Sequence, residues 1–188
     1  MKNNKFFKEN VVPALVLVII CLVVTAALAF TYGVASPIIA ENEKATADAA
    51  RGQVLPKGDA FTLYEGELVD GVAECYTADN GAGVAVTSTF SSFGGTLTSM
   101  VGIDKEGKIT GVTVTGHADT PGLGTKAMEV DYLANNYNGL DSAEAESIKE
   151  DANVDAITGA TISSNAVNQC VREALAQYEN MKGNGGLT

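Results

Sequence analysis

The sequence has few of the side chains that most metal sites need. Its 188 residues include one histidine, His117, and three cysteines, and no two cysteines form a C-x-x-C pair. Zinc and iron–sulfur centres are usually held by several such side chains at short spacing. We therefore predict no metal site, and we expect His117 to be an ordinary loop or core residue.

The cysteines leave two structural alternatives open. Cys21 lies in an apolar run near the N-terminus, whereas Cys75 and Cys170 lie beyond it. Cys75 and Cys170 could form a disulfide. Alternatively, Cys170 is a buried free thiol, because it falls on the apolar face of the last predicted helix.

Basic side chains are also scarce. Residues 11–188 carry 9 basic and 22 acidic side chains, a net charge of −13. Such a charge repels phosphate backbones, so we predict no nucleic-acid binding. The chain also lacks a G-x-G-x-x-G motif between a strand and a helix, which argues against a nicotinamide site. We predict no catalytic residue for a soluble substrate.

By contrast, the sequence contains one long apolar run, from Val11 to Phe30, without a charge. As a helix these residues would be about 30 Å long, enough to cross a membrane, and we assign residues 11–33 to a transmembrane helix. A cleaved signal peptide with a cleavage site at Ala27–Ala29 is an alternative, although the run is longer than a usual signal-peptide core. A lipoprotein start at Cys21 is disfavoured by the large Ile20 before it.

The charges that flank this run predict its orientation. Three lysines precede it, so residues 1–10 should be cytoplasmic and the chain beyond the span should be extracytoplasmic. Ser36 and Pro37 then predict the start of a polar helical stalk over residues 34–55 that ends near Gly52. We expect a domain over residues 56–182 and a flexible tail over residues 183–188.

The pattern beyond the stalk predicts an α+β domain. Between Phe61 and Thr115, short runs rich in valine and threonine alternate with glycines, which is typical of an antiparallel sheet, and Asp104–Lys108 reads as a hairpin loop. Helical patterns follow at Thr125–Asn136 and Ser142–Lys149, and a long amphipathic helix begins between residues 161 and 165. The fold class is therefore one antiparallel sheet flanked by helices, after a single transmembrane helix.

The start of the last helix carries the first informative motif, "DAITGATISSNAV" at Asp155–Val167. Backbone N–H groups at a helix start lack partners and favour an anion. Neither Ser163 nor Ser164 has an acid or amide three residues on, so a capping box is missing. The alternative is that Thr161, Ser163 or Ser164 is an ordinary N-cap.

A second motif, "GHADTPGLGTKA", occupies Gly116–Ala127. Pro121 favours a turn, while Gly122 and Gly124 allow the backbone to approach another group closely. By itself this loop predicts only close packing.

Together the two motifs resemble a known family. D-x-x-[ST]-G-A-[ST] before a helix, with H-x-[ED]-T-P-G-L-G some forty residues earlier, is similar to the FMN-binding domain of two respiratory complexes. One is the G subunit of the Rnf ferredoxin:NAD oxidoreductase, and the other is the C subunit of the sodium-translocating NADH:quinone reductase. Val54–Pro56, Phe93–Gly95 and the hairpin sequence also match, and the short chain favours the Rnf protein.

The resemblance implies a set of cofactor-binding residues. In the family, a phosphoester joins FMN covalently to the last hydroxyl residue of the first motif, which is Thr161 here. The family's second loop lies along the flavin ring, and this chain has an aspartate where the family usually has glutamate. The remaining residues implied to bind FMN are Asp155, Thr158, Gly159 and Ala160 in the first motif, and Asp119, Thr120, Leu123, Gly124 and Lys126 in the second.

The resemblance also implies a function and partners. The protein would relay electrons through FMN between other membrane and redox subunits of a complex in the cell membrane. A separate flavin transferase would attach the FMN outside the cytoplasm, using FAD and magnesium and releasing AMP. Alternatives are the C subunit of the quinone reductase, a free-standing flavinylated protein, or an anchored domain without a cofactor.

Overall fold

The computed structural model describes residues 12–143 and 147–185 and divides the chain into two units, residues 1–46 and 47–188. The predicted cytoplasmic segment 1–10 lies outside the described residues, as do residues 186–188 of the predicted tail. We describe each unit separately.

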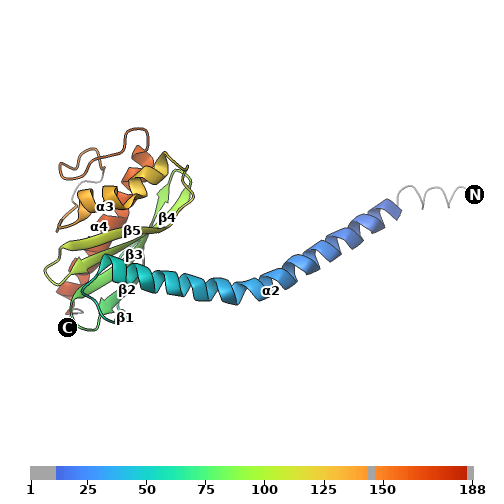
Figure 1. Ribbon diagram of the computed structural model, residues 1–188, viewed down its shortest axis with the longest axis horizontal. Helices are drawn as coiled ribbons and strands as arrows, with labels where there is room; N and C mark the ends of the chain where they lie inside the picture. The colour runs from blue at the N-terminus through green and yellow to red at the C-terminus, as the bar shows by residue number, and fades with distance from the viewer. Residues whose placement is uncertain (1–11, 144–146, 186–188) are drawn as a thin grey trace, which may run out of the picture. The chain divides into compact units, whose positions relative to one another are not determined.

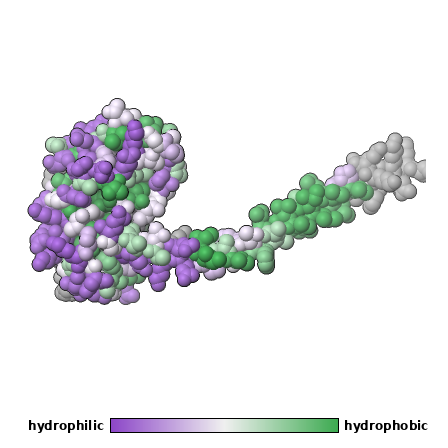
Figure 2. Space-filling view, in the orientation of Figure 1, coloured by the Kyte–Doolittle hydropathy of each residue, from purple (hydrophilic) through white to green (hydrophobic). Residues whose placement is uncertain are grey.

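Helix α2 runs from Val12 to Val54 as one helix of 43 residues, with Pro37 inside it. The expected start of a separate helix at Ser36 is therefore wrong. The φ of proline is compatible with a helix, but the residue removes one hydrogen bond and its ring crowds the carbonyl four residues earlier, so Pro37 weakens α2 here without ending it. Among the described residues, α2 is the one helix long and apolar enough to cross a membrane, with a mean hydropathy of 2.9 in its most apolar window. Figure 2 shows hydrophobic side chains gathered on the N-terminal part of α2 and hydrophilic ones in its later part.

The second unit contains a five-stranded sheet in which each strand pairs with the next in the sequence, all antiparallel (Figure 1). The predicted meander and the α+β class are confirmed. The predicted loop Asp104–Lys108 joins the last two strands, whose pairing closes with Ile103 opposite Ile109. The strands are β1 (Phe61–Leu63), β2 (Val72–Ala78), β3 (Gly83–Ser92), β4 (Gly95–Asp104) and β5 (Ile109–Gly116).

Helices cover both faces of this sheet. On one face, α3 (Val130–Tyr137) and α4 (Thr161–Gly183) bury the alternate apolar side chains of the strands. On the other face, Ala50 and Val54 from the last turns of α2 pack with two sheet residues, Ala85 and Met100. The main core therefore lies between the sheet and α4, and it holds the first turn of α4 in place.

Two predicted helices differ from the structure. The helix expected at residues 125–136 is split into a 3-10 helix, η2 (Gly124–Met128), and α3, with Glu129 extended between them. Ala127 and Leu133 are both buried, and one continuous helix would point them to different sides, so the break lets both reach the core. The described residues of Ser142–Lys149 form no helix, and residues 144–146 lie outside the described part.

The two cysteines of the second unit are free and buried, so the disulfide alternative is wrong. Cys75 Sγ lies 3.4 Å from Met181 Sδ on α4. Burial raises the pKa of the Cys75 and Cys170 thiols to about 12. Both therefore act as small apolar core residues at neutral pH.

Candidate functional site

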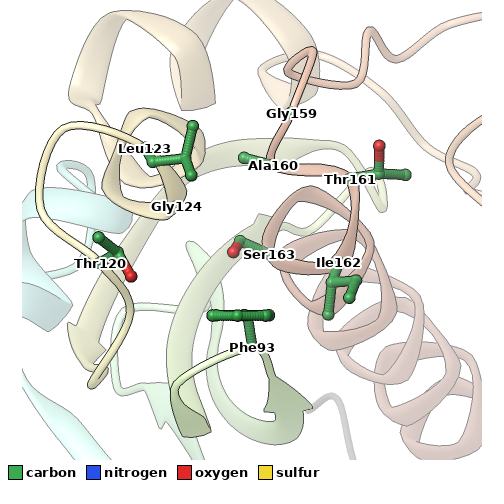
Figure 3. A pocket seen from close by; sticks show the side chains of 9 residues that line it. All are labelled: Phe93, Thr120, Leu123, Gly124, Gly159, Ala160, Thr161, Ile162 and Ser163. Atoms are coloured by element: carbon green, nitrogen blue, oxygen red, sulfur yellow. The ribbon is translucent and has the colours of Figure 1, made fainter.

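A pocket of about 380 Å³ opens where three segments meet: the turn between β3 and β4, the loop that follows β5, and the start of α4 (Figure 3). These segments are distant in the sequence, and the sheet and α4 bring them together. The lining residues are Phe93, Thr120, Leu123, Gly124, Gly159, Ala160, Thr161, Ile162 and Ser163.

The start of α4 has no side-chain cap. Its N-cap residue is Ala160, which makes no side-chain capping hydrogen bond. Gly159, with φ of +84°, turns the chain into the helix, a conformation that favours glycine. The Ser164 hydroxyl instead accepts a hydrogen bond of 3.1 Å from the Ile157 N–H. The ordinary N-cap alternative is therefore wrong, and the first N–H groups of α4 remain available to an anion.

Two hydroxyl side chains of α4 line the pocket, and they differ in accessibility. Thr161, the first residue of the helix, is half-buried, whereas Ser163 is only 2% exposed. The Ser163 hydroxyl is also engaged, because it donates a hydrogen bond to the Asp119 carboxylate. Thr161 is therefore the more accessible hydroxyl of this helix start.

The loop after β5 forms the opposite wall, through Thr120, Leu123 and Gly124. A Cβ atom on Gly124 would lie 2.7 Å from Ser163 Oγ and 2.9 Å from Asp119 Cβ. Only glycine allows the loop to approach α4 this closely. The close packing predicted for this loop is confirmed.

Asp119 lies behind the pocket wall rather than in the lining. It is 4% exposed, and its carboxylate accepts hydrogen bonds from the Ser92 hydroxyl and the Gly94 N–H as well as from Ser163. Burial by itself raises the pKa of Asp119, but these hydrogen bonds and the nearby His117 outweigh it and hold the pKa below its ordinary value of 3.8. The carboxylate is therefore ionised at neutral pH.

Three other predicted residues also lie outside the lining: Lys126, Asp155 and Thr158, all with exposed side chains. The backbone of Asp155 is anchored to α3, because its N–H donates to Asn136 Oδ1 and its carbonyl accepts from the Tyr132 hydroxyl, each at 2.7 Å. Asp155 therefore helps to hold the segment that leads to Gly159.

The lining includes residues that sequence reasoning did not select. Ile162 and Ser163 were not singled out as ligand contacts, and Phe93 was noted only as part of a matching turn. Ile162 is 57% exposed although it is apolar, and Phe93 and Leu123 are 70% and 47% exposed. An apolar residue on the solvent side of an amphipathic helix is the signal that could have found Ile162.

Similarity to known proteins was found over the same region and beyond it. Residues 92–176 match the family described as FMN-binding domain. The chain is 32% identical to the G subunit of the Na(+)-translocating ferredoxin:NAD(+) oxidoreductase complex of Acetobacterium woodii, over 89% of this chain and 90% of that protein. It is 26% identical to the G subunit of the proton-translocating ferredoxin:NAD(+) oxidoreductase complex of Clostridium ljungdahlii, again over 89% and 90%. This chain belongs to the G-subunit family.

The resemblance that the motifs predicted is thereby confirmed. This G-subunit family member is also 32% identical to the G subunit of the ion-translocating oxidoreductase complex of Stutzerimonas stutzeri, over 86% of this chain and 78% of that protein. Among solved structures, the crystal structure of Shewanella oneidensis NqrC matches with a TM-score of 0.47 and 20% identity, over 59% of this chain and 61% of that chain.

The pocket has the properties that FMN needs. The uncapped start of α4 suits a phosphate, because its free N–H groups and the helix dipole favour negative charge. The exposed apolar side chains at the mouth, Phe93, Leu123 and Ile162, suit a flat aromatic ring. FMN has both parts, so the described residues fit it.

Proposed function

We propose that this protein is the electron-carrying G subunit of a membrane-bound, ion-translocating ferredoxin:NAD oxidoreductase complex, and that its FMN is bound covalently to Thr161. Bound FMN supplies the ability to accept and pass on one or two electrons. The observation that carries the proposal is the position of Thr161, accessible at the uncapped start of α4 in an apolar-rimmed pocket. Relatives named as G subunits, similar over about 90% of both chains, favour a complex over a free-standing protein.

In this proposal the residues of the pocket divide the work. The first N–H groups of α4 hold the phosphate, and Phe93, Leu123 and Ile162 hold and shield the ring. Thr120 and Gly124 form the facing wall. The protein fixes the position of the redox group and excludes water from one side of it, and it needs no group that acts on a soluble substrate.

The charge of the domain supports a covalent tether. None of the nine described lining residues is lysine or arginine, and residues 11–188 have a net charge of −13. A helix start supplies only about half a positive charge, whereas a free phosphate monoester carries nearly two negative charges at neutral pH. An ester to Thr161 removes one of those charges and also prevents the cofactor from dissociating.

The attachment reaction balances with FAD as the donor. A bond forms between Thr161 Oγ1 and the phosphorus of the FMN half of FAD, the anhydride bond between the two phosphates breaks, and AMP leaves. The hydroxyl proton passes to a base of the flavin transferase or to solvent. We place this step outside the cytoplasm, with residues 1–10 inside and α2 as the membrane anchor, because the flanking lysines favour that orientation.

The test is covalent flavin content. The full chain, produced together with a flavin transferase, should give a fluorescent band on a denaturing gel and a mass increase of one FMN. Thr161→Ala should abolish both signals, and Thr161→Ser should retain them because the hydroxyl remains. Thr62→Ala is the matched control, because Thr62 is an exposed threonine of β1 that belongs to neither motif and lies outside the pocket lining. A wild-type chain without flavin, or a flavinylated Thr161→Ala variant, would contradict the proposal.

A further inference from the structure

The second inference concerns Asp119 and rests on the proposed function. We infer that Asp119 is a positioning residue: its buried carboxylate joins the three segments of the pocket and so presents the Thr161 hydroxyl for attachment of the flavin, without touching the flavin itself.

Asp119 and its hydrogen-bond donors together belong to the three segments that line the pocket. Ser92 and Gly94 belong to the end of β3 and the turn after it, 27 and 25 residues before Asp119. Ser163 belongs to the first turn of α4, 44 residues after it. Asp119 itself belongs to the loop that supplies Thr120, Leu123 and Gly124. One carboxylate therefore connects every segment that lines the pocket.

The burial of this cluster makes the carboxylate difficult to replace. Ser92 is 9% exposed, Ser163 is 2% exposed and Asp119 is 4% exposed. Three donors converge on two carboxylate oxygens, which have enough lone pairs to accept all of them. Alanine at this position would leave two buried hydroxyls and one N–H without their acceptor, and the segments would separate to reach water.

The link to Thr161 runs through Ser163. The two residues are in the same helical turn. Holding Ser163 against Asp119 therefore fixes the orientation of this turn, and with it the direction of the Thr161 side chain. The same hydrogen bond keeps the Ser163 hydroxyl occupied in the wall of the pocket. Asp119 therefore contributes both to the position of the acceptor hydroxyl and to the choice of Thr161 over Ser163.

The test uses the flavin-free full chain as the substrate of a flavin transferase, with kcat and KM measured for FMN incorporation. Asp119→Ala should lower kcat/KM at least about 30-fold, mainly through kcat, because a displaced hydroxyl loses its reactive alignment even when the proteins are bound. Asp119→Glu should restore the rate to within about threefold, since glutamate keeps the acceptor. Ser163→Ala and Ser92→Ala each remove one donor and should give intermediate rates, which keeps the test informative if Asp119→Ala does not fold.

Asp104→Ala is the matched control. Asp104 also accepts two backbone hydrogen bonds, from Glu106 and Lys108, but it lies in the hairpin between β4 and β5. This variant should incorporate FMN at the wild-type rate. Equal rates for wild type, Asp119→Ala and Ser163→Ala would overturn the inference, as would a loss that appears only in KM.

Amide hydrogen exchange of the flavin-free chain separates this inference from the proposed function. Asp119→Ala should lose protection together at residues 92–95, 117–124 and 159–164, whereas Asp104→Ala should lose it only in the hairpin. If wild type shows the joint protection but accepts no flavin, the proposed function fails, while the role of Asp119 in joining the three segments is retained. If Asp119→Ala keeps that protection, the inference about Asp119 is wrong, whatever the result for flavin attachment.

Discussion

The two ends of the sheet are each organised by an aspartate, but in different ways. At the hairpin end, Asp104 accepts hydrogen bonds of 2.9 Å from Glu106 and Lys108, its neighbours two and four residues on. At the pocket end, Asp119 accepts from residues that lie 25 or more positions away in the sequence. The hairpin is a local structure, whereas the pocket exists only after the sheet and α4 have packed.

This difference predicts that substitutions at the two ends will have different effects on the free energy of unfolding and on flavin attachment, and both can be measured. Local turns close with little loss of chain entropy, so a substitution in one affects mainly that turn. A long-range junction fails as a unit, because each of its segments is held only by the others. We therefore expect changes in the buried junction at the pocket end to alter flavin attachment and stability together, and changes at the hairpin end to alter stability alone.

The largest effect is expected for Gly124→Ala. The added methyl group would meet Ser163 Oγ at 2.7 Å and Asp119 Cβ at 2.9 Å in a buried junction, so we expect a loss of about 2–3 kcal/mol in the free energy of unfolding. Flavin attachment should fall as well. Urea unfolding of the full chain in mild detergent, with in-gel flavin fluorescence, measures both.

The paired change at the other end is Gly107→Ala. Gly107 has φ of +88°, a conformation that alanine adopts at a cost of about 1 kcal/mol in folding free energy. The new Cβ would also lie 3.2 Å from the Tyr178 ring. We expect this moderate loss of stability with unchanged flavin attachment. A larger effect on flavin at Gly107 than at Gly124 would contradict the contrast between the two ends.

The same contrast explains what the sequence could predict. The hairpin loop and the strands around it were predicted, because glycine, aspartate and alternating valines act over a few residues. The start of α4 was predicted from the spacing of Val167, Val171 and other core residues. The motif resemblance identified Thr161, Thr120, Leu123 and Gly124, which the structure brings into one pocket; their contact with FMN stays a prediction.

The failures depend on tertiary packing. Pro37 was expected to begin a helix, but it lies within α2, which continues despite the lost hydrogen bond and the crowding by the proline ring. Periodicity predicted one continuous helix, but the extended Glu129 separates η2 from α3. This interruption lets Ala127 and Leu133 both be buried. The implied contact of Asp119 with the flavin is a different case and stays a prediction: its carboxylate lies behind the lining, held by donors from two segments that are distant in the sequence.

Glu173, further along α4, offers a comparison with Asp119, because it is half-buried and one of its carboxylate oxygens has no hydrogen-bond donor. Its Oε2 atom is buried and has no hydrogen-bond partner. Burial, together with the nearby Asp70, raises the pKa of Glu173 to about 7 although Arg172 opposes this. The folded state therefore holds a proton that the unfolded state loses near pH 4.5, so stability should fall as pH rises from about 4.5 to 7 and then level off.

Glu173→Gln should remove this decline. Because the side chain is partly exposed, solvent reduces the effect, and we expect the variant to be more stable than wild type at pH 8 by about 1 kcal/mol. At pH 4 the two should be nearly equal. Urea unfolding at both pH values gives the comparison, and a wild-type chain that becomes more stable between pH 5 and 7 relative to Glu173→Gln would refute the assignment.

The smallest effect on stability is expected at the rim of the pocket. Phe93 is 70% exposed, so Phe93→Ala should change the free energy of unfolding by less than about 0.5 kcal/mol. The flavin should still attach, but its absorption and fluorescence should shift because the ring loses an aromatic neighbour. Leu63→Ala, at an exposed position of β1, is the control and should leave the flavin spectrum unchanged.

The central claim is that the pocket end carries a flavin on one particular oxygen, and peptide mapping tests it most directly. The flavinylated wild-type chain is denatured, washed and digested, and the peptide with residues 155–172 is fragmented in a mass spectrometer. We predict one FMN moiety located on Thr161 and none on Thr158, Ser163 or Ser164. An FMN located on any of the other three residues, or a peptide of unmodified mass, would contradict it.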